Sequence, residues 1–222
     1  PQVQEQLDRA PHRLVHVDDT GRDLDAYRAS AAAVGNERMA FTNSFSEPLV
    51  EGWLALVDAA AQQEGVGAAG ATGSWESLLN CSIEDRRVRR RNGELPVWRG
   101  VWGIAKIAAK HPAFPNPHLR TNGFVIDRKF FLSLLMLPHP TQLDALGFES
   151  GRRGMTVQIN ERGRSVVVVD RSGRVFSARR WRESRTFRTS EQEGLLIADN
   201  RTREYERATP ERRAELKFRA WG

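Results

Sequence analysis

Apolar residues recur along the chain with two different periods, and together they predict alternating helices and strands. Spacing of three and four residues predicts helices over 24–34, 48–63, 128–137, 155–163 and 210–218. Short apolar runs predict strands over 39–42, 66–69, 123–126, 165–169 and 174–177. Strands that alternate with helices typically pair in parallel through crossover connections. We therefore expect an α/β fold with a mostly parallel open sheet flanked by helices.

The segment over 165–177 predicts a β-hairpin within this framework. A β-branched run at 165–169 is followed by the turn sequence Asp-Arg-Ser-Gly and by a second apolar run. We expect a core over 1–163, and a segment over 164–222 that adds the hairpin, a lid strand and a helical extension to the same domain.

Residues 81–115 interrupt the predicted core as a basic, helical insertion. Five arginines lie between positions 86 and 91, and an amphipathic stretch over 97–109 contains Trp98 and Trp102. We interpret the insertion as a mobile element beside the site. A helix on a membrane surface and a solvated helix that covers the sheet are alternatives.

Composition narrows the class of protein only slightly. The formal net charge of +6 would attract phosphates, nucleic acid or anionic lipid, but 30 of the 34 basic residues are arginine, which GC-rich coding alone can produce. The single cysteine, Cys81, excludes an internal disulfide framework and favours a reducing compartment. The sequence contains no apolar stretch of about 18 residues and no signal-peptide pattern at its start.

Three polar, glycine-rich runs lie at the boundaries of predicted strands and indicate a ligand site. They occupy 43–47, 70–77 and 116–123. Open α/β sheets hold their ligands at strand ends, and packing alone does not require residues of this kind there.

The first run resembles a motif of bacterial GT-A fold (family 2-like) inverting glycosyltransferases. In that family an apolar-Leu-Asn-x-Asp segment precedes Gly-Trp-Leu; here Phe-Thr-Asn-Ser-Phe-Ser-Glu precedes Gly-Trp-Leu at 52–54. The resemblance implies that Asn43, Ser44 and Ser46 surround a donor diphosphate. It also implies Mg²⁺ or Mn²⁺, but serines stand where the family has its metal-binding aspartate. Glu47 is the nearest carboxylate and would make a weak site for a hard cation; Ser46 could equally cap the following helix.

The second run resembles the family's next strand, Val-Gly-x-Val-Gly. Its glycines allow the backbone to approach a ligand closely. By this resemblance, sugar or acceptor contacts come from Thr72, Ser74, Trp75 and Glu76.

The third run resembles the strand at the donor–acceptor junction of the family. His118 and Arg120 would meet the diphosphate, because arginine presents a fork of donors to phosphate oxygens. Arg120 would then replace the charge of a metal, and Asn122 would face the acceptor. A surface ion pair is the alternative reading of Arg120.

Glu149 lies where the family carries its general base. That carboxylate takes the proton from the acceptor hydroxyl as it attacks the anomeric carbon. The alternative is a carboxylate that caps the next helix.

Two outlying segments complete the set of candidates. The turn at 18–23 resembles a family turn beside the nucleotide, which makes Asp19, Gly21 and Asp23 donor candidates or helix caps. Near the C-terminus, Trp181 and Arg185 would belong to a lid over the sugar or acceptor, although an interface with another subunit explains them equally well.

The resemblance also implies that the first βαβ unit of the family is missing, because this chain has room for one strand before the turn at 18–23.

We expect a hexosyltransferase-type enzyme that moves a sugar from a nucleotide-diphosphate sugar to a glycan or lipid-linked acceptor. It would act in the cytoplasm or at the inner face of the plasma membrane, with peripheral membrane contact and oligomerisation left open. A non-catalytic glycan-binding or scaffold module is the alternative. A nucleic-acid binder ranks lower, because aromatic residues do not interleave with the arginine cluster.

Overall fold

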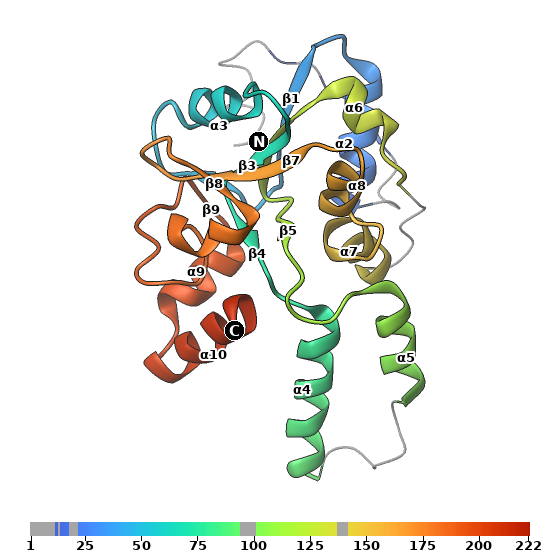
Figure 1. Cartoon of the computed structure of the whole chain (residues 1–222), viewed down its shortest axis with the longest axis vertical. Coiled ribbons are helices and arrows are strands. Elements are labelled where there is room, and N and C mark those ends of the chain that lie inside the picture. Colours follow the sequence, from blue (N-terminus) through green and yellow to red (C-terminus); the bar gives the residue numbers. More distant parts are fainter. Residues whose placement is uncertain (1–11, 13, 18–21, 94–100, 137–141) are drawn as a thin grey trace.

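A five-stranded sheet forms the centre of the protein in a computed structural model that describes residues 12, 14–17, 22–93, 101–136 and 142–222 (Figure 1). Its strand order is β1-β6-β3-β7-β8. The strands are β1 (Arg38–Thr42), β3 (Val66–Gly70), β6 (Gly123–Asp127), β7 (Ser165–Val169) and β8 (Val175–Ser177). Two short antiparallel pairs accompany it, β2 (Glu47–Pro48) with β9 (Ile197–Ala198) and β4 (Gly73–Ser74) with β5 (His118–Leu119).

The prediction of a mostly parallel, GT-A-like sheet is wrong. Strand β6 runs antiparallel to both β1 and β3, and β7 runs antiparallel to β8. Among the described strands, β3 and β7 form the one parallel pair. The prediction assumed that each helical connection returns the chain to the same edge of the sheet. Between β3 and β6 the chain instead leaves through β4 and returns through β5, which pairs with β4, so β6 starts where β3 ends.

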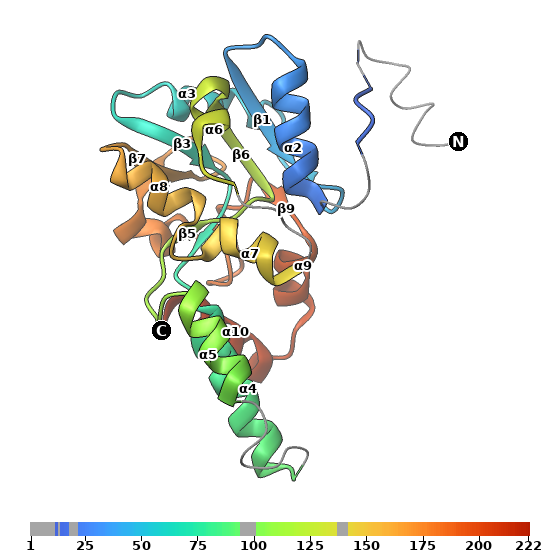
Figure 2. The same cartoon turned by 90° about the vertical axis from the view of Figure 1, so that its right-hand side faces the viewer.

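Helices cover both faces of the sheet. Alternate residues of a strand point to opposite faces; Ala68, Ile126 and Val168 pack with α2 (Arg22–Ala33), α6 (Arg128–Ser133), α7 (Gln142–Ser150) and α8 (Met155–Glu161). Ala69 and Val125 pack on the other face with α3 (Trp53–Ala61). Figures 1 and 2 show the resulting three layers.

The predicted hairpin over 165–177 is confirmed. Val167 lies opposite Ser177, and Asp170 accepts hydrogen bonds from the backbone N–H groups of Ser172 and Arg174 within the turn. Because Asp170 is 1% exposed, the turn is anchored in the body of the protein.

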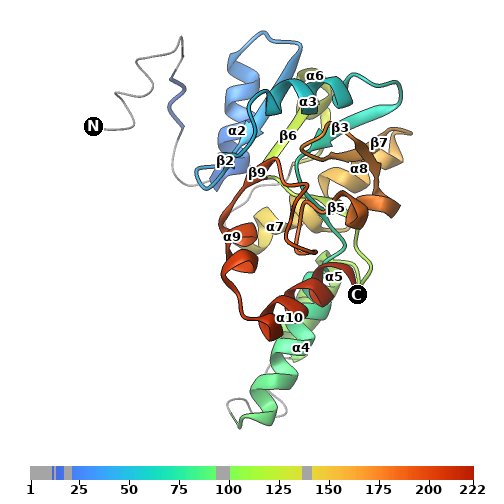
Figure 3. The same cartoon turned by 90° about the vertical axis from the view of Figure 1, so that its left-hand side faces the viewer.

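Two helices were not predicted, α7 and α9 (Asn200–Arg207), whereas α4 (Leu78–Arg91) falls in the insertion that was expected to be helical. The insertion forms α4 and α5 (Val101–Lys110), which extend from the body in Figures 1 to 3. The chain ends in the 3₁₀ helix η1 (Ala178–Ser184), β9, α9 and α10 (Pro210–Trp221). Within the described ranges, every helix is too short or too polar to cross a membrane.

Candidate functional site

The three polar runs meet at one edge of the sheet. Thr42, the last residue of β1, lies opposite Gly123, the first residue of β6, and Gly70 at the end of β3 lies opposite Phe124. If β6 ran parallel to its neighbours, its start would lie at the far edge. The antiparallel direction of β6, which the sequence analysis did not predict, therefore brings the third run to the other two.

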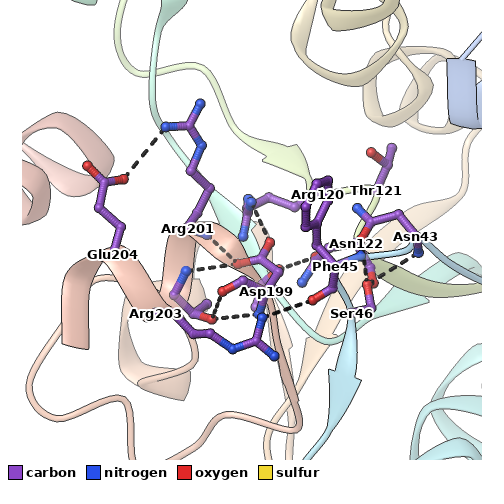
Figure 4. Close-up of polar contacts among 12 residues, drawn as sticks. Asn43, Phe45, Ser46, Arg120, Thr121, Asn122, Asp199, Arg201, Arg203 and Glu204 are labelled. Atoms are coloured by element: carbon purple, nitrogen blue, oxygen red, sulfur yellow. Dashed lines mark hydrogen bonds and ion pairs between the residues drawn. The ribbon is translucent and has the colours of Figure 1, made fainter. Parts of the chain in front are cut away.

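Hydrogen bonds join all three runs into one cluster, of which Figure 4 shows the residues of the first and third runs. Asn43 donates its backbone N–H to Ser46 Oγ at 3.2 Å, and the Ser46 hydroxyl contacts the Asn122 carbonyl oxygen. Thr72 Oγ1 donates to Asn122 Oδ1 at 2.6 Å. Asn43, Ser46 and Thr72 thus fix the position of Asn122, and Ser46 does not cap a helix, since it precedes β2.

A buried ion pair ties this cluster to the C-terminal part of the chain. Arg120 Nη2 lies 2.7 Å from Asp199 Oδ2, and these side chains are 12% and 1% exposed. Asp199 also caps α9, because its Oδ1 accepts the backbone N–H groups of Arg201 and Thr202. Burial would raise the pKa of Asp199, but Arg120 and the Thr202 N–H outweigh burial and hold the pKa below its usual range. The ion pair of Arg120 is therefore buried, unlike the surface pair that was the alternative to its role in diphosphate binding.

A second buried arginine, Arg188, lies next to the first. The guanidinium carbons of Arg120 and Arg188 are 4.3 and 5.0 Å from the centroid of the Phe187 ring. Arg188 is 3% exposed and contacts Glu76 and Glu204 at 3.1 and 3.2 Å. Burial lowers the pKa of Arg188; Glu76 opposes this effect, and Arg120 adds to it.

The loop that carries Arg188 is held in an unusual conformation. Four non-glycine residues adopt left-handed φ angles of 53°, 44°, 48° and 55°, namely Arg185, Arg188, Ser190 and Gln192. Each such residue costs about 1 kcal/mol or more, and conformations of this kind gather at functional sites. The fold thus maintains strain at the position where it places the second arginine.

Three buried N–H groups in this cluster have no hydrogen-bond partner within the described part of the chain. They belong to Arg120 Nη1, Asn122 Nδ2 and Arg188 Nε. A buried donor without a partner costs about 1–3 kcal/mol, so its presence in a native fold calls for an explanation. Oxygens of an anion are acceptors of the kind that these groups lack, and they form charge-assisted hydrogen bonds with such donors. We refer to Arg120, Asn122 and Arg188 as the donor cluster.

Glu149 adjoins the donor cluster through the neighbouring backbone. Its Oε1 accepts the Thr121 N–H at 3.1 Å, and Tyr27 donates its hydroxyl to the Thr121 carbonyl at 3.3 Å. Burial raises the pKa of Tyr27, and the nearby Asp23 and Glu149 raise it further. The alternative that Glu149 caps a helix does not hold, because it lies in the last turn of α7 and Gly154 is the N-cap of α8.

His118 lies buried beside this carboxylate. Burial lowers its pKa, although Glu149 has the opposite effect. Its Nδ1 is 2.8 Å from the Asn116 carbonyl oxygen. A neutral imidazole here can orient groups by hydrogen bonding, but it adds no charge for a diphosphate.

The side chains that the structure describes around this cluster do not fit a divalent cation. Glu47, the candidate ligand, is on strand β2 and forms an ion pair with Arg203. Among the described residues, no three His, Cys, Asp or Glu side chains come together as a metal site. Hard cations require several oxygen ligands, so the positive charge at this edge comes from arginine.

The candidates for sugar contacts divide between the cluster and the core. Glu76 reaches Arg188, whereas Ser74 is buried and accepts the Glu76 N–H through its Oγ. Trp75 donates Nε1–H to the Ala178 carbonyl and packs edge-on against Trp221, with centroids 5.5 Å apart. Trp181 is 1% exposed. These contacts assign the two tryptophans to packing.

The remaining candidates lie outside the cluster. Ser44 is exposed in a turn, Asp23 is exposed in the first turn of α2, and Arg185 is exposed and paired with Glu193 at 3.1 Å. Asp19 and Gly21 lie outside the described residues.

Sequence reasoning missed Arg188, Asp199 and Tyr27. A signal was available for Asp199, because Asp-Asn-Arg-Thr at 199–202 has the spacing of a capping box. Nothing in the sequence distinguishes Arg188 from the other arginines, since its role depends on the backbone of a strained loop.

Comparisons with known proteins produced no match to the chain among family models, curated proteins or solved structures. The resemblance to inverting glycosyltransferases therefore rests on the three runs and on Glu149.

Proposed function

We propose that the protein transfers a sugar from a nucleotide-diphosphate sugar to a hydroxyl acceptor, with inversion and without a divalent cation. The observation that carries this proposal is a set of three buried N–H groups without partners among the described residues, two of them on Arg120 and Asn122, which flank the Thr121 N–H that binds Glu149. An inverting displacement needs a stabilised leaving group on one side of the reacting carbon and a base for the attacking hydroxyl on the other. The donor cluster would supply the first requirement, and Glu149 the second.

The donor cluster suits a diphosphate because its charges are both strong and preorganised. Arg120 and Arg188 are held by Asp199, Glu76 and Glu204, so their guanidinium planes are fixed before a ligand binds. Each still directs one N–H group that lacks an acceptor. Donors that need no reorganisation stabilise the charge that develops on a leaving phosphate oxygen.

Glu149 suits the role of base because one of its oxygens is already oriented. The Thr121 N–H binds Oε1, which leaves Oε2 to accept the proton of an acceptor hydroxyl. Thr121 stands between Arg120 and Asn122 in the chain. The same short segment therefore positions the base and the N–H groups that would bind the phosphates.

The motif resemblance supports a sugar nucleotide as the donor and a glycan or lipid-linked molecule as the acceptor. It also supports action in the cytoplasm or at the inner face of the plasma membrane. A non-catalytic module with the same binding site is the alternative, and turnover distinguishes the two.

The test is a panel of sugar nucleotides assayed for nucleotide release and transfer, in buffer that contains EDTA. We expect turnover of at least one donor by the wild-type protein. Glu149→Gln should reduce the rate by about 10²–10⁴-fold, the usual contribution of a general base, without a change in nucleotide affinity.

Glu161→Gln is the matched control, because Glu161 is an exposed residue at the end of α8. It should leave the rate unchanged. Nucleotide binding without turnover of any donor would favour the non-catalytic module, and an unchanged rate for Glu149→Gln would disprove the role of the base.

A further inference from the structure

Helices α4 and α5 form a helical arm that extends away from the sheet (Figures 1 and 3). All residues of α4 lie in the described part of the chain, and none of them is buried. Helices in proteins gain most of their stability from packing an apolar face. The core therefore does not explain why this helix is present.

The arm carries nearly all of the excess charge of the protein. Helices α4 and α5 contain seven basic and two acidic residues, a net charge of +5 out of +6 for the whole chain. Arg87, Arg89, Arg90 and Arg91 are exposed on α4. Outside these two helices, the remaining 27 basic and 26 acidic residues nearly cancel, so the excess charge is concentrated on the arm.

Apolar side chains accompany these arginines at the surface. A groove of about 810 Å³ lies between α4 and α10, and its lining includes Ile83, Val88, Phe114 and Phe218. Val88 is 43% exposed and Phe218 is 71% exposed. The Arg219–Asp85 ion pair, at 2.6 Å, joins the two helices beside the groove.

We propose that α4 and α10 dock the protein on an anionic phospholipid bilayer. The arginines would contact lipid phosphates, and Val88 and Phe218 would enter the interface between headgroups and acyl chains. Interfacial helices combine a basic face with apolar side chains in this way. A nucleic acid would match the charge, but it offers no counterpart for the aliphatic residues Ile83 and Val88.

This surface is separate from the donor cluster but is connected to it by the chain. Ser77, which caps α4, ends the same run that contributes Thr72 to the cluster. Docking would therefore hold the site near the membrane, where a lipid-linked acceptor resides. Only this last consequence rests on the proposed transferase function; bilayer binding does not.

The test is sedimentation of the protein with vesicles of phosphatidylcholine, with and without 30 mol% phosphatidylglycerol (about one lipid in three), in the absence of nucleotide. We expect binding to the anionic vesicles only, with affinity that falls as salt rises. A triple variant, Arg87→Gln, Arg90→Gln and Arg91→Gln, should bind about 100-fold more weakly, since each basic residue near such a surface contributes about 1 kcal/mol. Phe218→Ser should weaken binding without removing the salt dependence.

A second triple variant provides the control for net charge. Arg171, Arg179 and Arg182 are exposed arginines of the hairpin turn and η1, and their replacement by glutamine should leave vesicle binding unchanged. Equal loss in both triple variants, or no binding to anionic vesicles, would overturn the proposal. Binding of a DNA or RNA oligonucleotide in place of the vesicles, with the same loss in the α4 variant, would identify the arm as a nucleic-acid surface. Normal sugar transfer by a protein that does not bind vesicles would overturn the docking surface alone.

Discussion

Arg120 and Asp199 connect the edge of the sheet to the C-terminal helices through an ion pair of 2.7 Å that is almost fully shielded from solvent. The pair does two things at once. It orients Arg120, whose Nη1 has no hydrogen-bond partner among the described residues, and it fixes Asp199 as the cap of α9. The site and the C-terminal segment should therefore depend on each other for stability.

Removing one partner of this pair should destabilise the whole protein. Asp199→Asn retains a side chain that can cap α9 but leaves Arg120 buried without its counter-charge. The expected loss in the free energy of unfolding is about 3–5 kcal/mol, measured by urea denaturation. Glu183→Gln, which breaks the exposed pair with Arg180, should change nothing measurable. A similar midpoint for both variants would contradict the importance of burial.

Gly73 should tolerate no side chain. A Cβ at this position would lie 2.5 Å from the Trp181 ring, and Trp181 is buried in the core. Gly73→Ala should therefore lower the free energy of unfolding by about 1–3 kcal/mol. Gly147→Ala is the matched control: its Cβ meets nothing within 4 Å inside α7, and it should raise stability by roughly 0.5–1 kcal/mol. Thermal unfolding of both variants measures the difference, and a stable Gly73→Ala variant would refute the packing described for Trp181.

Stability should decrease as the pH falls below 6.5. Burial lowers the pKa of both His111 and His118 from 6.5 in the folded protein. Below that pH the unfolded chain takes up protons that the folded protein does not, so protonation favours unfolding. Urea denaturation across this range should show a free energy of unfolding that is nearly constant close to pH 7 and declines below 6.5. His118→Gln should make the decline shallower; an identical slope would show that His118 does not titrate in this way.

Strand positions were predictable from the sequence, but the direction of β6 was not. Apolar runs mark β1, β3, β6, β7 and β8, because buried strands must be apolar wherever they lie. Strand direction depends instead on the path between β3 and β6, which runs through a 14-residue helix rich in arginine. No apolar periodicity marks that helix, since none of it is buried. The three polar runs were therefore expected to meet on the basis of an incorrect topology.

The location of the candidate site could be predicted from the sequence, but several of the residues that form it could not. Asn43, Thr72, Arg120, Asn122 and Glu149 come together as expected from their positions at strand ends or, for Glu149, from the motif resemblance. Trp75 and Trp181 were placed in the site by their chemistry, yet the fold uses both in packing. Arg188 could not be found, because its burial results from tertiary contacts with Glu76 and Glu204.

The central claim is that the buried donor cluster binds a diphosphate without a metal, and calorimetric titration with UDP in EDTA tests it most directly. Asn122→Asp keeps the acceptor of the Thr72 hydrogen bond and replaces the unpartnered donor with a carboxylate oxygen. We predict that the wild-type protein binds UDP, and that Asn122→Asp binds about 10–100-fold more weakly. Asn160→Asp, which adds the same charge at an exposed position on α8, should bind as the wild type does. Failure of the wild-type protein to bind UDP, or equal affinity in Asn122→Asp, would contradict the account.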